Sequence, residues 1–70
     1  MNTTSIEIPR PQAMREARRR LKLTQQVLAY RVGCTESMMT KIETGRATPA
    51  QWLKEAIARE LGIHSWEVGQ

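Results

Sequence analysis

The chain has 70 residues, a formal net charge of +4 and a sequence pI of about 10.0. This length allows one domain with a thin core, which gains stability from oligomerisation or a bound partner. The single cysteine, Cys34, excludes a disulfide framework within the chain. No apolar run approaches the roughly 18 residues of a membrane span, and the start lacks the apolar segment of a signal peptide. We therefore expect a cytoplasmic protein with no membrane role.

The charge is unevenly distributed along the chain. Residues 1–46 contain nine Lys/Arg and four Glu, a balance of +5, whereas residues 47–70 contain two and three, a balance of −1. A basic half joined to a near-neutral half suggests one side that faces a polyanion and one structural side. Ordinary solvated charge is the alternative interpretation.

The N-terminal region combines a non-helical segment with a weak helix. Residues 1–10 show no helical period, so we expect a flexible or extended arm. A first helix is expected from about Pro11 to Lys22, because proline suits a first helical turn. Its inward stripe contains two large apolar residues, one alanine and one charge: Met14, Ala17, Arg18 and Leu21.

Two short helices with matching start and stop signals are expected next. Thr24 is a natural N-cap and Gly33 a natural C-terminal stop; Thr35 and Gly45 repeat this pattern. Two helices this close together form a tight helix-turn-helix. Apolar pairs that could staple the two helix starts are Leu23 with Leu28 and Cys34 with Met39.

A fourth helix has the strongest predicted start. Thr48-Pro49-Ala50-Gln51 has the pattern of a capping box with proline in the first turn, and Ala47 could pack on Trp52 as a staple. Gly62 is expected to end the helix, and residues 65–68 to add one last turn. We predict an all-α bundle of four to five short helices, forming one domain over residues 11–70. The expected inward stripe of the fourth helix contains Trp52, Leu53, Ala56, Ile57 and Leu61.

The stretch LTQQVLAYRVGCTESMMTKIETGRATP, from Leu23 to Pro49, resembles the signature of the phage-repressor/Cro-like helix-turn-helix family (Cro/C1-type, or xenobiotic-response-element type). The matching elements are L-T-Q, L-A, V-G, the capping Thr, I-E-x-G and the following Pro, and the resemblance extends from about Met14 to Val68. It implies a lambda-repressor-like fold and a transcriptional regulator that binds double-stranded DNA. The major groove, about 12 Å wide, admits one α-helix, and a preceding helix braces it.

The resemblance also implies roles for individual residues. The third helix, about residues 36–44, would read bases, and Glu36 departs from the Gln that family members often carry. Its carboxylate either accepts a hydrogen bond from a cytosine amino group or only stabilises the helix N-terminus. Arg18 and Glu43 would form a partly buried ion pair with a structural role. The implied base-reading residues are Glu36, Ser37, Thr40 and Lys41, and the implied phosphate contacts are Gln25, Thr44 and Arg46.

A homodimer on a pseudo-palindromic operator is the expected assembly, because one helix-turn-helix reads only a few base pairs. Such a protein would be bacterial or phage-encoded and nucleoid-associated when bound. The alternative is an antitoxin or another protein-interaction module of a mobile element, in which Ile6 and Ile8 of the arm add a strand to a protein partner. The sequence offers no catalytic acid–base pair, nucleophile or metal cluster, so we expect no enzyme activity, cofactor or small-molecule substrate.

Overall fold

A computed structural model describes residues 12–69 of the chain. It contains the helices α1 (Ala13–Arg20), α2 (Gln25–Val32), α3 (Glu36–Glu43) and α4 (Gln51–Leu61), followed by the short 3₁₀ helix η2 (Ser65–Glu67). No strand occurs among the described residues, and the predicted all-α class is confirmed. The expected N-terminal arm and Pro11 lie outside the described residues.

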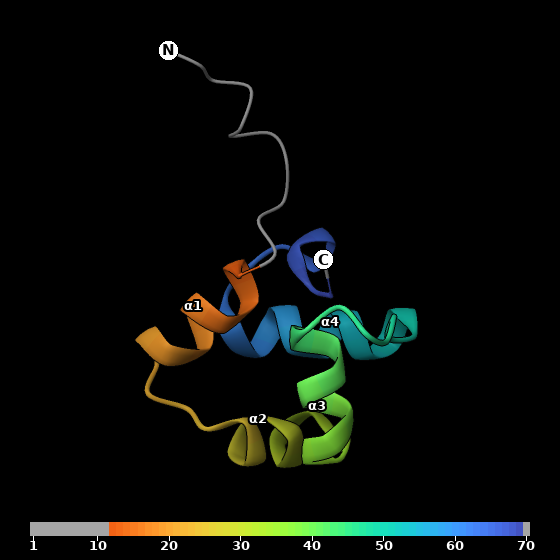
Figure 1. Cartoon of the computed structure of the whole chain (residues 1–70). Coiled ribbons are helices and arrows are strands. Elements are labelled where there is room, and N and C mark those ends of the chain that lie inside the picture. The colour runs from red at the N-terminus through yellow and green to blue at the C-terminus, as the bar shows by residue number, and fades with distance from the viewer. Residues whose placement is uncertain (1–11, 70) are drawn as a thin grey trace.

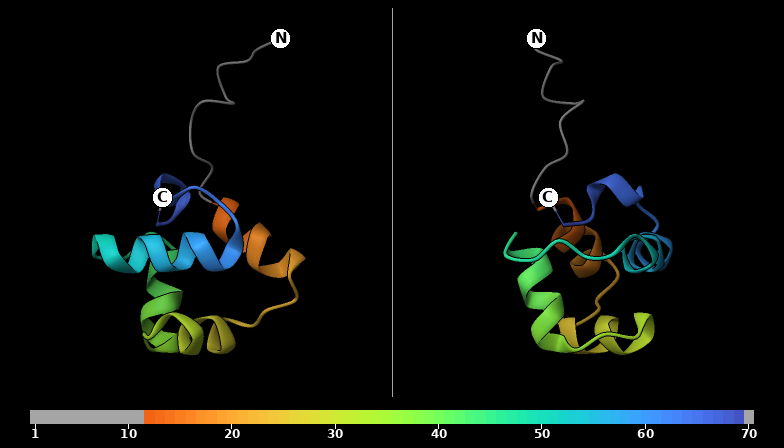
Figure 2. Two further views of the ribbon diagram at one scale, coloured as in Figure 1. Left: turned by 180° about the vertical axis from the view of Figure 1, so that it is seen from behind. Right: turned by 90° about the vertical axis from the view of Figure 1, so that its right-hand side faces the viewer.

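Helix α4 is the element on which most of the others pack. It contacts α1, α2 and η2, while α2 also contacts α3. In Figures 1 and 2, α2 lies at one end of the molecule and η2 at the other, with α4 between them. Helix α3 rises from the level of α2 to the level of α4. One outer side of α3 is therefore left uncovered by the other described helices.

One hydrophobic core joins all the helices. Leu21 was expected in this core but is 48% exposed, because α1 ends at Arg20 and the chain turns away before Leu21. Leu23 and Cys34 pack against the core from the helix starts, as the two predicted staples require. The buried apolar residues are Met14, Ala17, Leu28, Ala29, Val32, Met39, Ile42, Leu53, Ile57, Ala58, Leu61 and Val68.

The predicted N-caps of α2 and α3 are both confirmed. Thr24 Oγ1 accepts a hydrogen bond from the backbone N–H of Val27 at 3.0 Å. Thr35 Oγ1 accepts from the backbone N–H of Met38, also at 3.0 Å. Each hydroxyl satisfies one of the N–H groups that a helix start leaves without an intrahelical partner.

Glycines end these two helices as predicted. Gly33 and Gly45 have φ values of +89° and +77°, the left-handed region that other residues rarely adopt. After α3, the N–H of Gly45 returns to the Ile42 carbonyl at 3.2 Å and that of Arg46 to the Lys41 carbonyl at 2.8 Å. This pair of hydrogen bonds is a Schellman motif, which satisfies the last carbonyls of the helix and reverses the chain.

The end of α1 differs from the prediction by two residues. Lys22 has a φ of +59° and lies outside the helix, which ends at Arg20. Its N–H bonds to the Arg19 carbonyl at 2.9 Å, and the N–H of Leu23 bonds to the Arg18 carbonyl at 3.1 Å. This is again a Schellman pattern, but with lysine where glycine is usual. The helix therefore stops without the residue that normally marks a stop.

The predicted start of α4 is wrong. The N-cap is Ala50, no side chain caps the helix, and Pro49 precedes it as a buried loop residue. A Cβ on Gly69 would lie 3.0 Å from Pro49 Cδ, so the C-terminal segment covers the proline ring. Burial of this ring in the loop outweighs the local capping signal of Thr48.

The inward stripe of α4 also differs from the prediction at one residue. Trp52 is 59% exposed, so neither its core position nor its staple with Ala47 holds. The buried face instead contains Leu53, Ile57, Ala58 and Leu61. Gly62 and the final turn, now seen as η2, agree with the prediction.

Candidate nucleic-acid interface

Helix α3 has one buried side and one exposed polar side. Met39 and Ile42 are 0% exposed, and Glu43 is 6% exposed. The residues expected to read bases recur along the other side, as the 3.6-residue period of a helix requires. The structure leaves all four of them exposed: Glu36, Ser37, Thr40 and Lys41.

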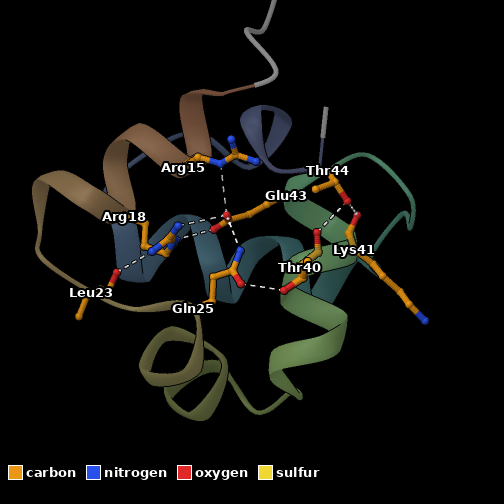
Figure 3. A network of polar contacts seen from close by, with 8 residues as sticks. All are labelled: Arg15, Arg18, Leu23, Gln25, Thr40, Lys41, Glu43 and Thr44. Carbon is orange, nitrogen blue, oxygen red and sulfur yellow. Dashed lines mark hydrogen bonds and ion pairs between the residues drawn. The ribbon is translucent and has the colours of Figure 1, made fainter.

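Glu43 and Arg18 meet between α3 and α1 in the arrangement shown in Figure 3. Arg18 Nε donates to Glu43 Oε2 at 2.6 Å, and Arg18 Nη2 donates to Oε1 at 3.3 Å. The Glu43 side chain is 0% exposed and that of Arg18 is 10% exposed. Arg18 Nη1 also donates to the Leu23 carbonyl at 2.8 Å. One guanidinium therefore joins α1, the α1–α2 connection and α3.

A second cation, which the sequence pattern does not single out, lies near the same carboxylate. Arg15 Nε lies 3.6 Å from Glu43 Oε1, and its side chain is 34% exposed. The signal was present, since residues three apart share a helix face and Arg15 precedes Arg18 by three. Its direction could be known only once α3 was placed against α1.

Gln25 extends this network from the buried carboxylate to the surface of α3 (Figure 3). Its Nε2 donates to Glu43 Oε1 at 2.9 Å, and its Oε1 accepts from Thr40 Oγ1 at 2.7 Å. Gln25 is the first residue of α2, so α1, α2 and α3 are all connected through one set of polar contacts. A residue expected to contact phosphate is thus bonded to a residue expected to read a base.

The other expected phosphate contacts lie near the end of α3. The Thr44 hydroxyl donates to the Thr40 carbonyl at 2.8 Å. Phosphate oxygens only accept hydrogen bonds, so Thr44 would have to rotate its hydroxyl to contact one. Arg46 is exposed and lies one residue past Gly45, at the end of the Schellman motif. Lys41 and Arg46 place two exposed cations at this end of α3.

The starts of α2 and α3 leave further donors available. The first two N–H groups of each helix precede its first cap or intrahelical hydrogen bond. Such groups, together with the helix dipole, favour anions. Glu36 already places a carboxylate in the first turn of α3, whereas α2 has no acidic residue there.

Cys34 and His64, residue types that often carry chemistry, lie outside this polar network. Burial raises the pKa of the half-buried Cys34 thiol, which reduces its thiolate fraction. His64 stacks on Trp66 with ring centroids 5.3 Å apart. The described residues hold no cluster of His, Cys, Asp and Glu suited to a metal ion, and none of their helices is long and apolar enough to cross a bilayer.

Comparison with known proteins agrees with this geometry. A family model described as a helix-turn-helix domain matches residues 12–66. An uncharacterized HTH-type transcriptional regulator of Methanothermobacter thermautotrophicus (strain ATCC 29096 / DSM 1053 / JCM 10044 / NBRC 100330 / Delta H) is 47% identical over 49 residues, which cover 70% of this chain and 71% of that protein. No solved structure matches the chain. The chain therefore belongs to the helix-turn-helix domain family.

Proposed function

We propose that the chain is a sequence-specific regulator of transcription that binds double-stranded DNA and inserts α3 in the major groove. The observation that carries the proposal is the division of α3 into a buried apolar side and an exposed polar side. Helix α2 packs against α3, as a bracing helix must. The family match supports the same function, as does the name of the Methanothermobacter relative, an uncharacterized HTH-type transcriptional regulator.

The side chains divide into two groups by the contacts that suit them. Glu36, Ser37, Thr40 and Lys41 would face base edges, because they lie on the exposed side of α3. Gln25 and Arg46, with Thr44 after rotation, would contact phosphates and fix the position of the domain on the duplex. Arg18 and Glu43 would serve the orientation of α3 and would not touch DNA.

A dimer is the assembly that gives this domain enough sequence information. One helix reads only a few base pairs, and two copies on a pseudo-palindrome double the length of the site. The two α3 helices would then lie about one turn of DNA apart, roughly 34–36 Å. Bound stoichiometry, measured by sedimentation of the complex, tests this part separately from DNA binding itself.

The decisive experiment selects bound sequences from a random DNA pool and titrates the selected duplex by fluorescence anisotropy at several salt concentrations. We expect a symmetric site, an affinity well above that for a scrambled duplex, and a steep fall of log K with log salt through counterion release. Failure to enrich any sequence, or binding that salt does not weaken, would contradict the proposed function. Two protein copies per selected site are expected if the dimer is correct.

A further inference from the structure

The contacts of Gln25 point to a role beyond phosphate binding. We propose that Gln25 is a positioning residue that sets base preference, because it holds the Thr40 hydroxyl as a hydrogen-bond donor to the protein and leaves only an acceptor for DNA. This inference rests on the proposed function, since it concerns which base α3 selects. It follows from the direction of three hydrogen bonds in Figure 3.

The buried carboxylate of Glu43 decides which groups of the network donate hydrogen bonds and which accept them. Glu43 has a side chain that is 0% exposed and accepts two hydrogen bonds from the Arg18 guanidinium. A carboxylate paired in this way only accepts. The group that Gln25 turns toward Glu43 Oε1, 2.9 Å away, must therefore be its Nε2. The opposite amide orientation would place two acceptor oxygens against each other.

The fixed amide then fixes the hydroxyl. With Nε2 facing Glu43, Gln25 Oε1 faces Thr40 Oγ1 at 2.7 Å, and an amide oxygen can only accept. Thr40 must donate its single hydroxyl proton to Gln25. What the exposed Thr40 hydroxyl still offers to solvent or DNA is its two lone pairs, which only accept hydrogen bonds. A buried charge pair thus sets the hydrogen-bonding character of a surface residue on another helix.

This arrangement restricts the bases with which the Thr40 hydroxyl can form a hydrogen bond. A free threonine hydroxyl donates or accepts and suits several bases, whereas an acceptor-only hydroxyl suits a base amino group. In the major groove these are adenine N6 and cytosine N4, while guanine and thymine present keto oxygens that only accept. On the strand that Thr40 contacts, we expect adenine or cytosine in preference to guanine or thymine.

The test compares Gln25→Met with the wild-type chain on the selected site and on duplexes that carry each of the four bases at every position. Thr40→Val, which removes the hydroxyl but keeps the shape, identifies the position that Thr40 reads. At that position the wild type should favour amino over keto bases by about fivefold, the factor that one neutral hydrogen bond supplies. Gln25→Met should reduce this ratio toward one, because the released hydroxyl can then donate to keto oxygens. In the Gln25→Met, Thr40→Val double variant, the ratio of affinities for amino and keto bases should fall no further than in Gln25→Met alone.

Controls separate this role from a structural one or from phosphate binding. Gln26→Met makes the same chemical change at the exposed neighbour on α2 and should leave the ratio unchanged. Thr40→Ser keeps the hydroxyl and should retain the preference. If Gln25→Met melts at a much lower temperature than the wild type, Gln25→Asn is used in its place, because the asparagine side chain is too short to reach both partners. In the free protein, Thr40→Val should shift the NMR signals of the Gln25 side-chain amide and leave those of Gln26 in place.

Three results would overturn the inference. One is a uniform loss of affinity for all sequences in Gln25→Met with the amino/keto ratio intact, which would describe a phosphate contact alone. Another is a wild-type preference for keto bases at the Thr40 position. The third is the absence of any position that responds to Thr40→Val. If the wild type binds no DNA sequence selectively, the proposed function fails and the inference fails with it. If the wild type binds selectively but gives one of the three results above, only the inference fails, so the two failures are distinguishable.

Discussion

Arg18 and Glu43 form a buried ion pair between α1 and α3. Arg18 Nε lies 2.6 Å from Glu43 Oε2, and the two side chains are 10% and 0% exposed. The two residues are 25 positions apart in the chain, so the pair fixes how α3 sits against α1. Two buried charges are stabilised mainly by each other and by the hydrogen bonds around them. The orientation of the proposed DNA-reading surface therefore depends on groups that never reach that surface.

The first prediction concerns this pair. Glu43→Gln should lower the free energy of unfolding by about 3 kcal/mol, because it leaves the Arg18 guanidinium buried without an opposite charge. Thermal or urea unfolding followed by circular dichroism measures the loss. The matched control is Glu60→Gln, which breaks the exposed Arg31–Glu60 pair (3.0 Å) and should cost less than about 1 kcal/mol. Equal melting temperatures for Glu43→Gln and the wild type would show that the pair contributes nothing.

The second prediction concerns the left-handed residue after α1. Lys22→Gly should stabilise the domain by about 1 kcal/mol, because glycine adopts the φ of +59° without the steric cost that lysine carries. The gain should appear as a rise of roughly 4–8 °C in Tm. Lys22→Ala is the control, since it keeps the Cβ and should bring no such gain. A Tm for Lys22→Gly at or below the wild-type value would contradict the strained conformation.

The third prediction separates true helix caps from an apparent one. Thr24→Ala and Thr35→Ala should each destabilise the domain by about 1 kcal/mol, because each removes a hydroxyl that accepts a backbone N–H at 3.0 Å. Thr48→Ala should change stability by less than about 0.5 kcal/mol, because α4 begins at Gln51 behind Ala50. If Thr48→Ala destabilises the domain as much as the other two substitutions do, Thr48 caps α4 after all and the prediction is wrong.

Local signals in the sequence predicted the helix-turn-helix well because they depend only on neighbouring residues. Thr24 and Thr35 cap the helices that follow them, and Gly33 and Gly45 adopt the left-handed conformation expected of them. Caps and stops of this kind act over four or five residues. The separation of α3 into a buried and an exposed side followed from its helical period in the same way.

Tertiary contacts explain what the sequence did not reveal. Thr48 and Pro49 look like a helix start, but the proline ring is buried under the chain end, so α4 starts later. Lys22 ends a helix in a conformation that no residue type signalled. The link from Gln25 to both Glu43 and Thr40 required the three-dimensional arrangement of α2 and α3, because 18 and 15 residues separate these partners along the chain.

The fourth prediction concerns the cation after α3. Arg46→Gln should reduce the slope of log K against log salt by about 1, as expected when one phosphate contact is lost, while base preference stays the same. Salt titrations of the selected duplex measure this slope. Arg59→Gln removes the same charge from the last turn of α4, about 12 Å along the helix from its start, and should leave the slope nearly unchanged. Equal slopes for Arg46→Gln and the wild type would remove Arg46 from the interface.

The fifth prediction concerns Glu36, an acidic side chain in the first turn of the proposed reading helix. Glu36→Gln should raise affinity several-fold for every DNA sequence, because unit charges 4 Å apart in water repel by about 1 kcal/mol and the substitution removes that repulsion from nearby phosphates. The substitution should also lower the free energy of unfolding by roughly 0.3–1 kcal/mol at low ionic strength, because the interaction of the carboxylate with the helix dipole is lost. Glu55→Gln, an equal charge change on α4, is the control. A selective loss of affinity for sites with cytosine at one position would instead show that the Glu36 carboxylate accepts a hydrogen bond from that base.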